Sequence, residues 1–395
     1  MLVALAALSL FYRSCLGVIA PELSRDLHLT PEDLGRANGA FFLAMAVMQI
    51  PVGLLFDRYG PRRVMAACTA LAVLAAAWHG LVGSAAELVA ARLLLGIGCA
   101  ASFMGAVTLC SLWHPGMHLS AMLSRVFAFS QVGTFLAATP LALAQETIGW
   151  RWAFVGMAAV TAVAGILFYR IVRDEATGAR PESLLEVVRG LAEVWRTPGL
   201  APILAIHTFA YASMATVLGL WAGPYLADVH GLDAAARGNV LLAMAAAQLA
   251  GILLYGPLDR VFDTRKWVVI PGAVGSVALL AALALLPHPP LALAVALLVL
   301  SCGVTAYSVI IVSHGRSLFP DRLVGRAVTT VNIAQVIGLT ALPVLTGEIV
   351  GAFEARAGAQ PEIAYQAAFG AIALTLAAGL AIYLRSRDAK PSRAR

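Results

Sequence analysis

The stretch "LSLFYRSCLGVIAPEL", residues 8–23, places one guanidinium, that of Arg13, in the middle of an apolar run. If this run lies in lipid, the buried charge costs about 2.5–3.5 kcal/mol, and Arg13 is too far from the start of the run to reach the interface. No carboxylate stands in the middle of any apolar run to neutralise it. An unpaired cation in such a place suits an anion. A structural contact with backbone carbonyls and a gating role stay open.

Other polar or aromatic side chains within apolar runs are candidates to complete a binding site: Tyr12, Gln131, His207, Tyr211, Tyr307, Asn332 and Gln335. His207 can change its charge near neutral pH, so a proton-coupled role and a neutral histidine bonded between helices are both open. The tyrosines also fit a role as interior aromatic residues. Cys15, Met214 and Met244 are soft ligands that, with His207, leave a copper carrier as an alternative, although their spacing forms no compact ligand set.

The composition predicts an integral membrane protein. Hydrophobic residues make up 61% of the 395 residues and charged residues only 12%, with a mean hydropathy of +0.85. A helix needs about 20 apolar residues to cross a bilayer, and such runs recur along the chain. We therefore expect an all-α membrane protein with twelve spans. They run over 2–21, 35–56, 64–82, 87–113, 124–145, 152–171, 200–225, 238–256, 267–286, 290–313, 326–348 and 365–384.

The positions of lysine and arginine predict the orientation. Placing residue 1 on the cytoplasmic side assigns most of the 27 basic residues to the cytoplasm, which also puts the other end of the chain there. The net charge of +6 is then a topology signal, since it is spread over the inner loops, and a nucleic-acid partner is not expected. A cleaved signal peptide is not expected either, because no basic leader precedes the first apolar run.

The chain also repeats itself. The sequence "YRSC" at 12–15 returns as "YASM" at 211–214, and "AFSQVGTFLAATPLALAQE" at 128–146 matches "NIAQVIGLTALPVLTGE" at 332–348. Two pseudo-symmetric six-helix bundles explain this pattern, and such duplication is typical of transporters. The predicted parts are an N-terminal bundle over 1–171, a cytoplasmic linker over 172–199 with an amphipathic helix at the membrane surface, and a C-terminal bundle with a basic tail over 200–395.

Four motifs can now be compared with a known family. They are "GLLFDRYGPRR" (53–63), "RLLLGIG" (92–98), "GWRWAF" (149–154) and "LFPDRLVGRA" (318–327), and together they resemble the major facilitator superfamily over the whole chain. The resemblance implies alternating access between two bundles, with Asp57 as a latch at the N-terminal end of helix eleven. The latch residues carried over are Gly53, Asp57, Arg58, Gly60, Arg62, Arg63 and Arg92. A second copy of the loop, "GPLDRVFDTRK" (256–266), lacks the glycine that corresponds to Gly60.

Several functions are excluded by the absence of their motifs. No "GK[ST]", "HExxH" or "GxSxG" occurs, so we expect neither direct ATP use nor an enzyme, and no cofactor or metal site. The expected protein is a monomeric transporter of a small organic anion in a bacterial inner membrane, with lipid around it and proton coupling left open. A proton-coupled exporter of drugs or metabolites and a copper carrier are alternatives, and a non-transporting receptor or assembly factor is a remote one.

Overall fold

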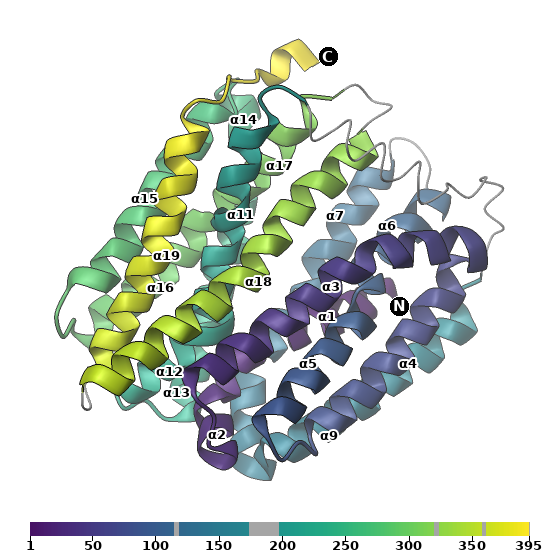
Figure 1. The fold of residues 1–395 in the computed structure, drawn as a ribbon. Coiled ribbons are helices and arrows are strands. Elements are labelled where there is room, and N and C mark those ends of the chain that lie inside the picture. Colours follow the sequence, from purple (N-terminus) through teal and green to yellow (C-terminus); the bar gives the residue numbers. More distant parts are fainter. Residues whose placement is uncertain (114–117, 174–196, 320–323, 358–360, 395) are drawn as a thin grey trace. The chain divides into compact units, whose positions relative to one another are not determined.

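The computed structural model describes residues 1–113, 118–173, 197–319, 324–357 and 361–394, and these segments are helices joined by short turns (Figure 1). Only short stretches of π and 3-10 geometry interrupt the α-helices, so the all-α prediction holds for this part of the chain. The predicted amphipathic helix of the linker, over 181–196, lies outside the described residues.

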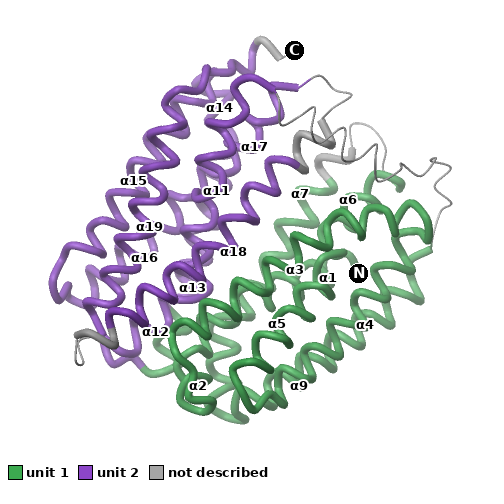
Figure 2. The backbone as a smooth tube through the Cα atoms, in the orientation of Figure 1, with its two compact units in different colours: residues 1–182, 233–239 green, residues 183–232, 240–395 purple. Residues whose placement is uncertain are grey.

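Two compact units make up the chain: residues 1–182 with 233–239, and residues 183–232 with 240–395 (Figure 2). The described helices of unit 1 are α1 (Leu2–Ser14), α2 (Leu16–Leu27), α3 (Pro31–Tyr59), α4 (Pro61–His79), α5 (Ala85–Cys99), α6 (Ala101–Trp113), α7 (His118–Ser130), α8 (Val132–Leu136) and α9 (Thr139–Ile171). The short segment 233–239 joins unit 1 because Arg237 pairs with Glu22, and because the Ala235 N–H donates to Glu146 over 3.0 Å.

Unit 2 contains the remaining described helices. They are α11 (Leu200–Thr216), η1 (Val217–Trp221), α12 (Ala222–Asp228), most of α13 (Ala234–Tyr255), α14 (Leu258–Val261), α15 (Lys266–Leu285), α16 (Leu291–Val304), η2 (Thr305–Tyr307), α17 (Ser308–Arg316), α18 (Val324–Ala357), α19 (Pro361–Tyr383) and η4 (Pro391–Ala394).

Nine helices in the described segments are long and apolar enough to cross a membrane, or ten if the bent pair α1 and α2 counts as one span. One of the nine runs over 122–171, which is 50 residues, and Gly149 within it has non-helical angles of φ 81° and ψ 154°. The sequence predicts a loop between two spans at that place. Helix α4 covers the predicted third span but is not among the nine.

Close helix contacts at glycine recur in equivalent places of the two units. A Cβ added at Gly133 in α8 would lie 1.8 Å from the Ala7 carbonyl oxygen of α1, and one at Gly338 in α18 would lie 1.7 Å from the Thr208 carbonyl oxygen of α11. These are the helices that the repeat in the sequence pairs with each other. Small residues allow two backbones in a membrane to approach this closely, so the internal repeat is visible in packing as well as in sequence.

We expect Gly133→Ala to reduce the folded yield and the melting temperature in detergent. The added methyl group meets backbone, which cannot rotate away, and overpacking of this kind costs about 1–3 kcal/mol. The matched control is Gly156→Ala in α9, where nothing lies within 4 Å of the added Cβ. Equal melting temperatures for the two variants would show that α1 and α8 do not pack as described.

Candidate functional site

Arg13 lies at the end of α1, where the chain bends by 48° into α2. Its Nη2 approaches the Met45 Sδ at 3.7 Å, and its guanidinium carbon lies 5.8 Å from the centre of the Phe42 ring and 5.4 Å from that of Phe103. Its Nε is buried and makes no hydrogen bond. The charge is therefore held by α3 and α6 through weak aromatic and sulfur contacts, with donors left over.

A second arginine contacts the backbone next to Arg13. Arg92 in α5 is completely buried, and its Nη1 donates to the Tyr12 carbonyl oxygen at 2.6 Å. Its Nη2 donates to Asn38 Oδ1 at 3.0 Å, and its guanidinium carbon lies 4.5 Å from the centre of the Phe41 ring. Arg92 thus supplies a donor to a carbonyl next to the break between α1 and α2, where helical hydrogen bonding is interrupted.

Neither arginine has a carboxylate partner within the segments that the structure describes. The acidic groups of the described ion pairs are Glu22, Asp26, Asp259 and Glu362, and their partners are other basic residues. Both arginines contact α3, Arg13 through Phe42 and Met45 and Arg92 through Asn38 and Phe41, so two cations lie in one largely apolar environment. Such a region is electropositive, and it can be neutralised by an anion that enters from outside the protein.

The Tyr12 side chain points away from the Arg13 guanidinium. Its hydroxyl group lies 2.7 Å from Thr161 Oγ1 and donates to the Met157 carbonyl oxygen at 3.2 Å, both in α9. The phenol is therefore hydrogen-bonded within the protein, beside the bond that Thr161 Oγ1 itself donates to the Met157 carbonyl at 2.7 Å. This placement favours a structural role for Tyr12, and contact with a ligand is not needed to explain it.

The remaining candidates are distributed between the units. Gln131 lies in unit 1 at the junction of α7 and α8 and is half-buried. In unit 2, His207 of α11 is buried without a hydrogen bond to either ring nitrogen, and Gln335 of α18 is the polar side chain beside it. Tyr211 and Asn332 are half-buried on the same two helices. The Tyr307 ring packs against Gly272 of α15 instead.

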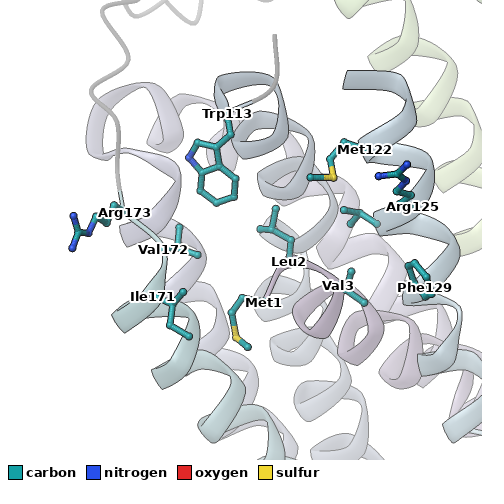
Figure 3. Close-up of a pocket in the computed structure, with 11 residues that line it drawn as sticks. Met1, Leu2, Val3, Trp113, Met122, Arg125, Phe129, Ile171, Val172 and Arg173 are labelled. Carbon is teal, nitrogen blue, oxygen red and sulfur yellow. The ribbon is translucent and has the colours of Figure 1, made fainter. Parts of the chain in front are cut away.

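A separate cavity of about 560 Å³ opens at one end of unit 1 (Figure 3). Its lining is mostly apolar, with Arg125 and Arg173 at its sides, and none of the predicted binding residues belongs to it. It is lined by Met1, Leu2, Val3, Trp113, Met122, Arg125, Val126, Phe129, Ile171, Val172 and Arg173. Since it contains neither Arg13 nor Arg92, we do not assign it to the binding of an anion in the span.

The residues that surround the two arginines could not be singled out from the sequence. Phe42, Met45 and Phe103 are ordinary apolar residues of two different spans, and nothing in their spacing relates them to Arg13. Asn38 gave a usable signal, because a polar amide within an apolar run needs a partner. The role of Arg92 next to α1 was also missed, since its motif suggested a latch.

The comparisons with known proteins decide the family. The sequence profile of the Major Facilitator Superfamily matches residues 2–238 and 203–395, which is almost the entire chain. The chain belongs to the Major Facilitator Superfamily. As a member of this superfamily it is a multi-pass integral membrane transporter, and it is not an enzyme.

Relatives and solved structures agree with this membership of the superfamily. A Cupriavidus necator protein named "Probable sulfoacetate transporter SauU" is 25% identical over 287 residues, which cover 67% of each chain. An Agrobacterium vitis protein whose name assigns it tartrate transport is 24% identical over 65% of this chain and 64% of its own length. The inward-facing, occupied structure of a bacterial homologue of the human lysosomal transporter Spinster has the same fold, with a TM-score of 0.81 at 19% identity over 97% of this chain and 94% of that one.

The superfamily loop between α3 and α4 takes the conformation that its sequence requires. Gly60 ends α3 with φ 80°, in the region where glycine is strongly favoured, and Pro61 begins α4. Arg62 donates from Nε and Nη2 to the Tyr169 carbonyl oxygen at 3.0 and 2.6 Å, so it ties α4 to α9 within unit 1. Asp57 and Arg58 are exposed. Gly53 has no close neighbour that would exclude a side chain, so its glycine is not explained by packing.

We expect Tyr12→Phe to lower stability by about 1 kcal/mol, because the hydrogen bond between the phenol and Thr161 is lost, while Thr161 Oγ1 keeps its own bond to the Met157 carbonyl. Thermal unfolding of the purified protein in detergent measures this loss. An unchanged melting temperature would show that the phenol does not tie α1 to α9.

Proposed function

We propose that this protein transports a small organic anion across the membrane by alternating access, with Arg13 as the residue that grips the anion. The observation that carries the proposal is the buried, unbonded Nε of Arg13 in a span where the described residues supply no carboxylate. A guanidinium presents a planar fork of donors, which matches a carboxylate, a sulfonate or a phosphate. Binding such a group repays the cost of keeping the cation in the span.

The surroundings of Arg13 favour a small anion with an apolar or slender body. The Phe42 and Phe103 rings lie beside the half-buried guanidinium and put apolar surface next to the charge. The buried Arg92 adds a second positive charge. Its Nη1 and Nη2 already donate to the Tyr12 carbonyl oxygen and to Asn38 Oδ1. The names of the relatives, which refer to sulfoacetate and tartrate, support an organic anion of this size.

The wider architecture belongs to the same proposal. Twelve spans result if the chain crosses the membrane at the bent pair α1 and α2, at α4, and twice over 122–171 in addition to the other long helices. Both ends of the chain are then cytoplasmic, the bundles are 1–171 and 200–395 with the linker between them, and the protein works as a monomer. The latch proposed for the cytoplasmic side is Asp57 with Arg58 and Arg63, whereas the contacts of Arg62 and Arg92 within unit 1 favour structural roles.

The alternatives have less support. A copper carrier would need Cys15 to accept a cation, but the Cys15 thiol lies 3.9 Å from the Arg92 guanidinium and donates to the Tyr12 carbonyl oxygen. An exporter of cationic drugs would face the same unneutralised arginines. A receptor or assembly factor that does not transport is distinguished from a carrier by flux measurements in liposomes.

Arg13→Ala should weaken binding of sulfoacetate or tartrate by about 10- to 100-fold, because a hydrogen bond to a charged group contributes about 1.5–3 kcal/mol. Arg13→Lys should keep part of the affinity, since lysine supplies the charge but not the planar fork. Ligand-dependent thermal stabilisation of the purified protein measures binding, and counterflow in proteoliposomes measures transport.

The matched control for Arg13 is Arg25→Gln, which removes an exposed arginine one helix away. It should bind as the wild-type protein does. Insertion of Arg13→Ala is not impaired, because removing a charge from a span makes integration easier. Full affinity of Arg13→Ala for both anions would make Arg13 a structural residue and would remove the basis of the proposal.

The proposal assigns proton coupling to His207. No described carboxylate lies next to Arg13 to carry a proton, whereas His207 is a buried imidazole with a polar neighbour, Gln335. His207→Gln should abolish accumulation driven by a pH gradient and leave anion exchange intact. The control is His79→Gln, since His79 is equally buried but is stacked on Phe154 in unit 1. Gradient-driven accumulation that survives in His207→Gln would remove this histidine from coupling.

A further inference from the structure

The second copy of the superfamily loop, between α13 and α15, is bound by a segment of its own unit. Residues 384–392 follow α19 and lie along the loop and the start of α15. Lys266 Nζ donates to the carbonyl oxygens of Leu384 and Ser386, each at 2.7 Å. Lys266, the first residue of α15, therefore binds the backbone that directly follows α19.

The middle of this segment is held by a carboxylate. Asp388 accepts hydrogen bonds from Thr264 Oγ1 at 2.7 Å, from the Lys266 N–H at 3.0 Å and from the Arg265 N–H at 3.2 Å. Partial burial by itself would raise the pKa of Asp388, but these hydrogen bonds lower it below its usual range. A carboxylate at this place also satisfies free N–H groups at the start of the 20-residue helix α15 and interacts favourably with its dipole.

His314 and Asp263 hold the segment at further points. The His314 Nε2 lies 3.0 Å from the Arg387 carbonyl oxygen, and its Nδ1 lies 2.7 Å from the Tyr383 hydroxyl. Beyond Asp388, the Asp263 carboxylate accepts from the Ser392 N–H at 2.8 Å and from Ser392 Oγ at 2.7 Å. The contacts therefore extend over the whole length of 384–392 and reach α15, α17 and the loop.

The loop itself explains why the chain tolerates the missing glycine. Gly60 in the first copy and Asp263 in the second occupy the same place in the aligned motifs, and both have positive φ, but their conformations differ. Gly60 has φ 80° and ψ 150°, a region essentially restricted to glycine, whereas Asp263 has φ 48°, a value that aspartate adopts more readily than most residues. At Asp263 the substitution adds a carboxylate, and that carboxylate is the group that receives Ser392.

We propose that residues 384–392 form a strap that holds the loop 258–266 to its own unit, so that this second copy of the motif is a fixed anchor and not a second latch. The Asp263 carboxylate of this loop accepts a hydrogen bond from Ser392, and the N-terminal end of α15 donates to Asp388. Asp259, one residue before the place that Asp57 holds in the first copy, is likewise engaged, since it pairs with Arg265 at 3.4 Å. The strap goes beyond the proposed transport function, and its test requires no substrate.

Hydrogen exchange measured by mass spectrometry on the full chain in detergent tests the strap. Asp388→Ala should speed exchange of the Arg265 and Lys266 amides by about tenfold or more, because each loses a charged acceptor. Ser392→Ala, at the far end of the strap, should speed exchange of the strap itself by a smaller factor. The control is Arg385→Gln, which changes an exposed side chain in the same segment.

The independence of the two loops is the second part of the test. Asp57→Asn should leave exchange over 258–266 unchanged, and Asp388→Ala should leave exchange over 57–63 unchanged. Wild-type exchange at Arg265 and Lys266 in both Asp388→Ala and Ser392→Ala would show that no strap holds the loop. Faster exchange over 258–266 in Asp57→Asn would show that this copy is coupled to the latch, and would also overturn the proposal.

Discussion

The candidate site depends on the hydrogen bond from the Arg92 guanidinium to the Tyr12 carbonyl. Helix α1 stops at Ser14 and α2 starts at Leu16, so backbone groups at this break need partners from elsewhere. Arg92 provides one, and Asn38 and the Phe41 ring complete its surroundings without neutralising it. Because the partner of the carbonyl is a cation and not a neutral donor, the break is stabilised and made electropositive by the same group.

Arg13 follows Tyr12 directly, so the contact that fixes the Tyr12 carbonyl also fixes the backbone from which Arg13 extends. The Tyr12 hydroxyl adds a second fixed point by bonding to Thr161 on α9. The Arg13 guanidinium is left with aromatic and sulfur neighbours that do not use up its donors. A cation that is held firmly but not satisfied is what an anion site requires, since little ordering remains to be done when the anion binds.

The sequence predicted the membrane class and the superfamily, because long apolar runs and a few motifs in them stand out. The importance of Arg13 rests on the same kind of signal, a rare residue in an apolar background, and stays a prediction. A charge, a repeated motif or a positive-φ glycine stands out there. It could not predict that Phe42 and Phe103 approach Arg13, because apolar residues in different spans carry no information about which of them meet. The sequence could not predict the direction of the Tyr12 hydroxyl for a related reason. On a helix that is apolar around its whole circumference, periodicity does not distinguish a face toward a cavity from a face toward α9.

The two copies of the loop motif both have a residue with positive φ before the next helix, but they use different residues there. Both turns need a residue with positive φ before the next helix, and that need is met by Gly60 in one copy and by Asp263 in the other. Glycine meets it without adding a side chain. Aspartate meets it with a charged group, and Ser392 donates two hydrogen bonds to that group. The change from glycine therefore adds an acceptor to the second loop. Together with the bonds of Asp388 to Thr264, Arg265 and Lys266, this acceptor favours a lasting contact over one that must form and break in every transport cycle.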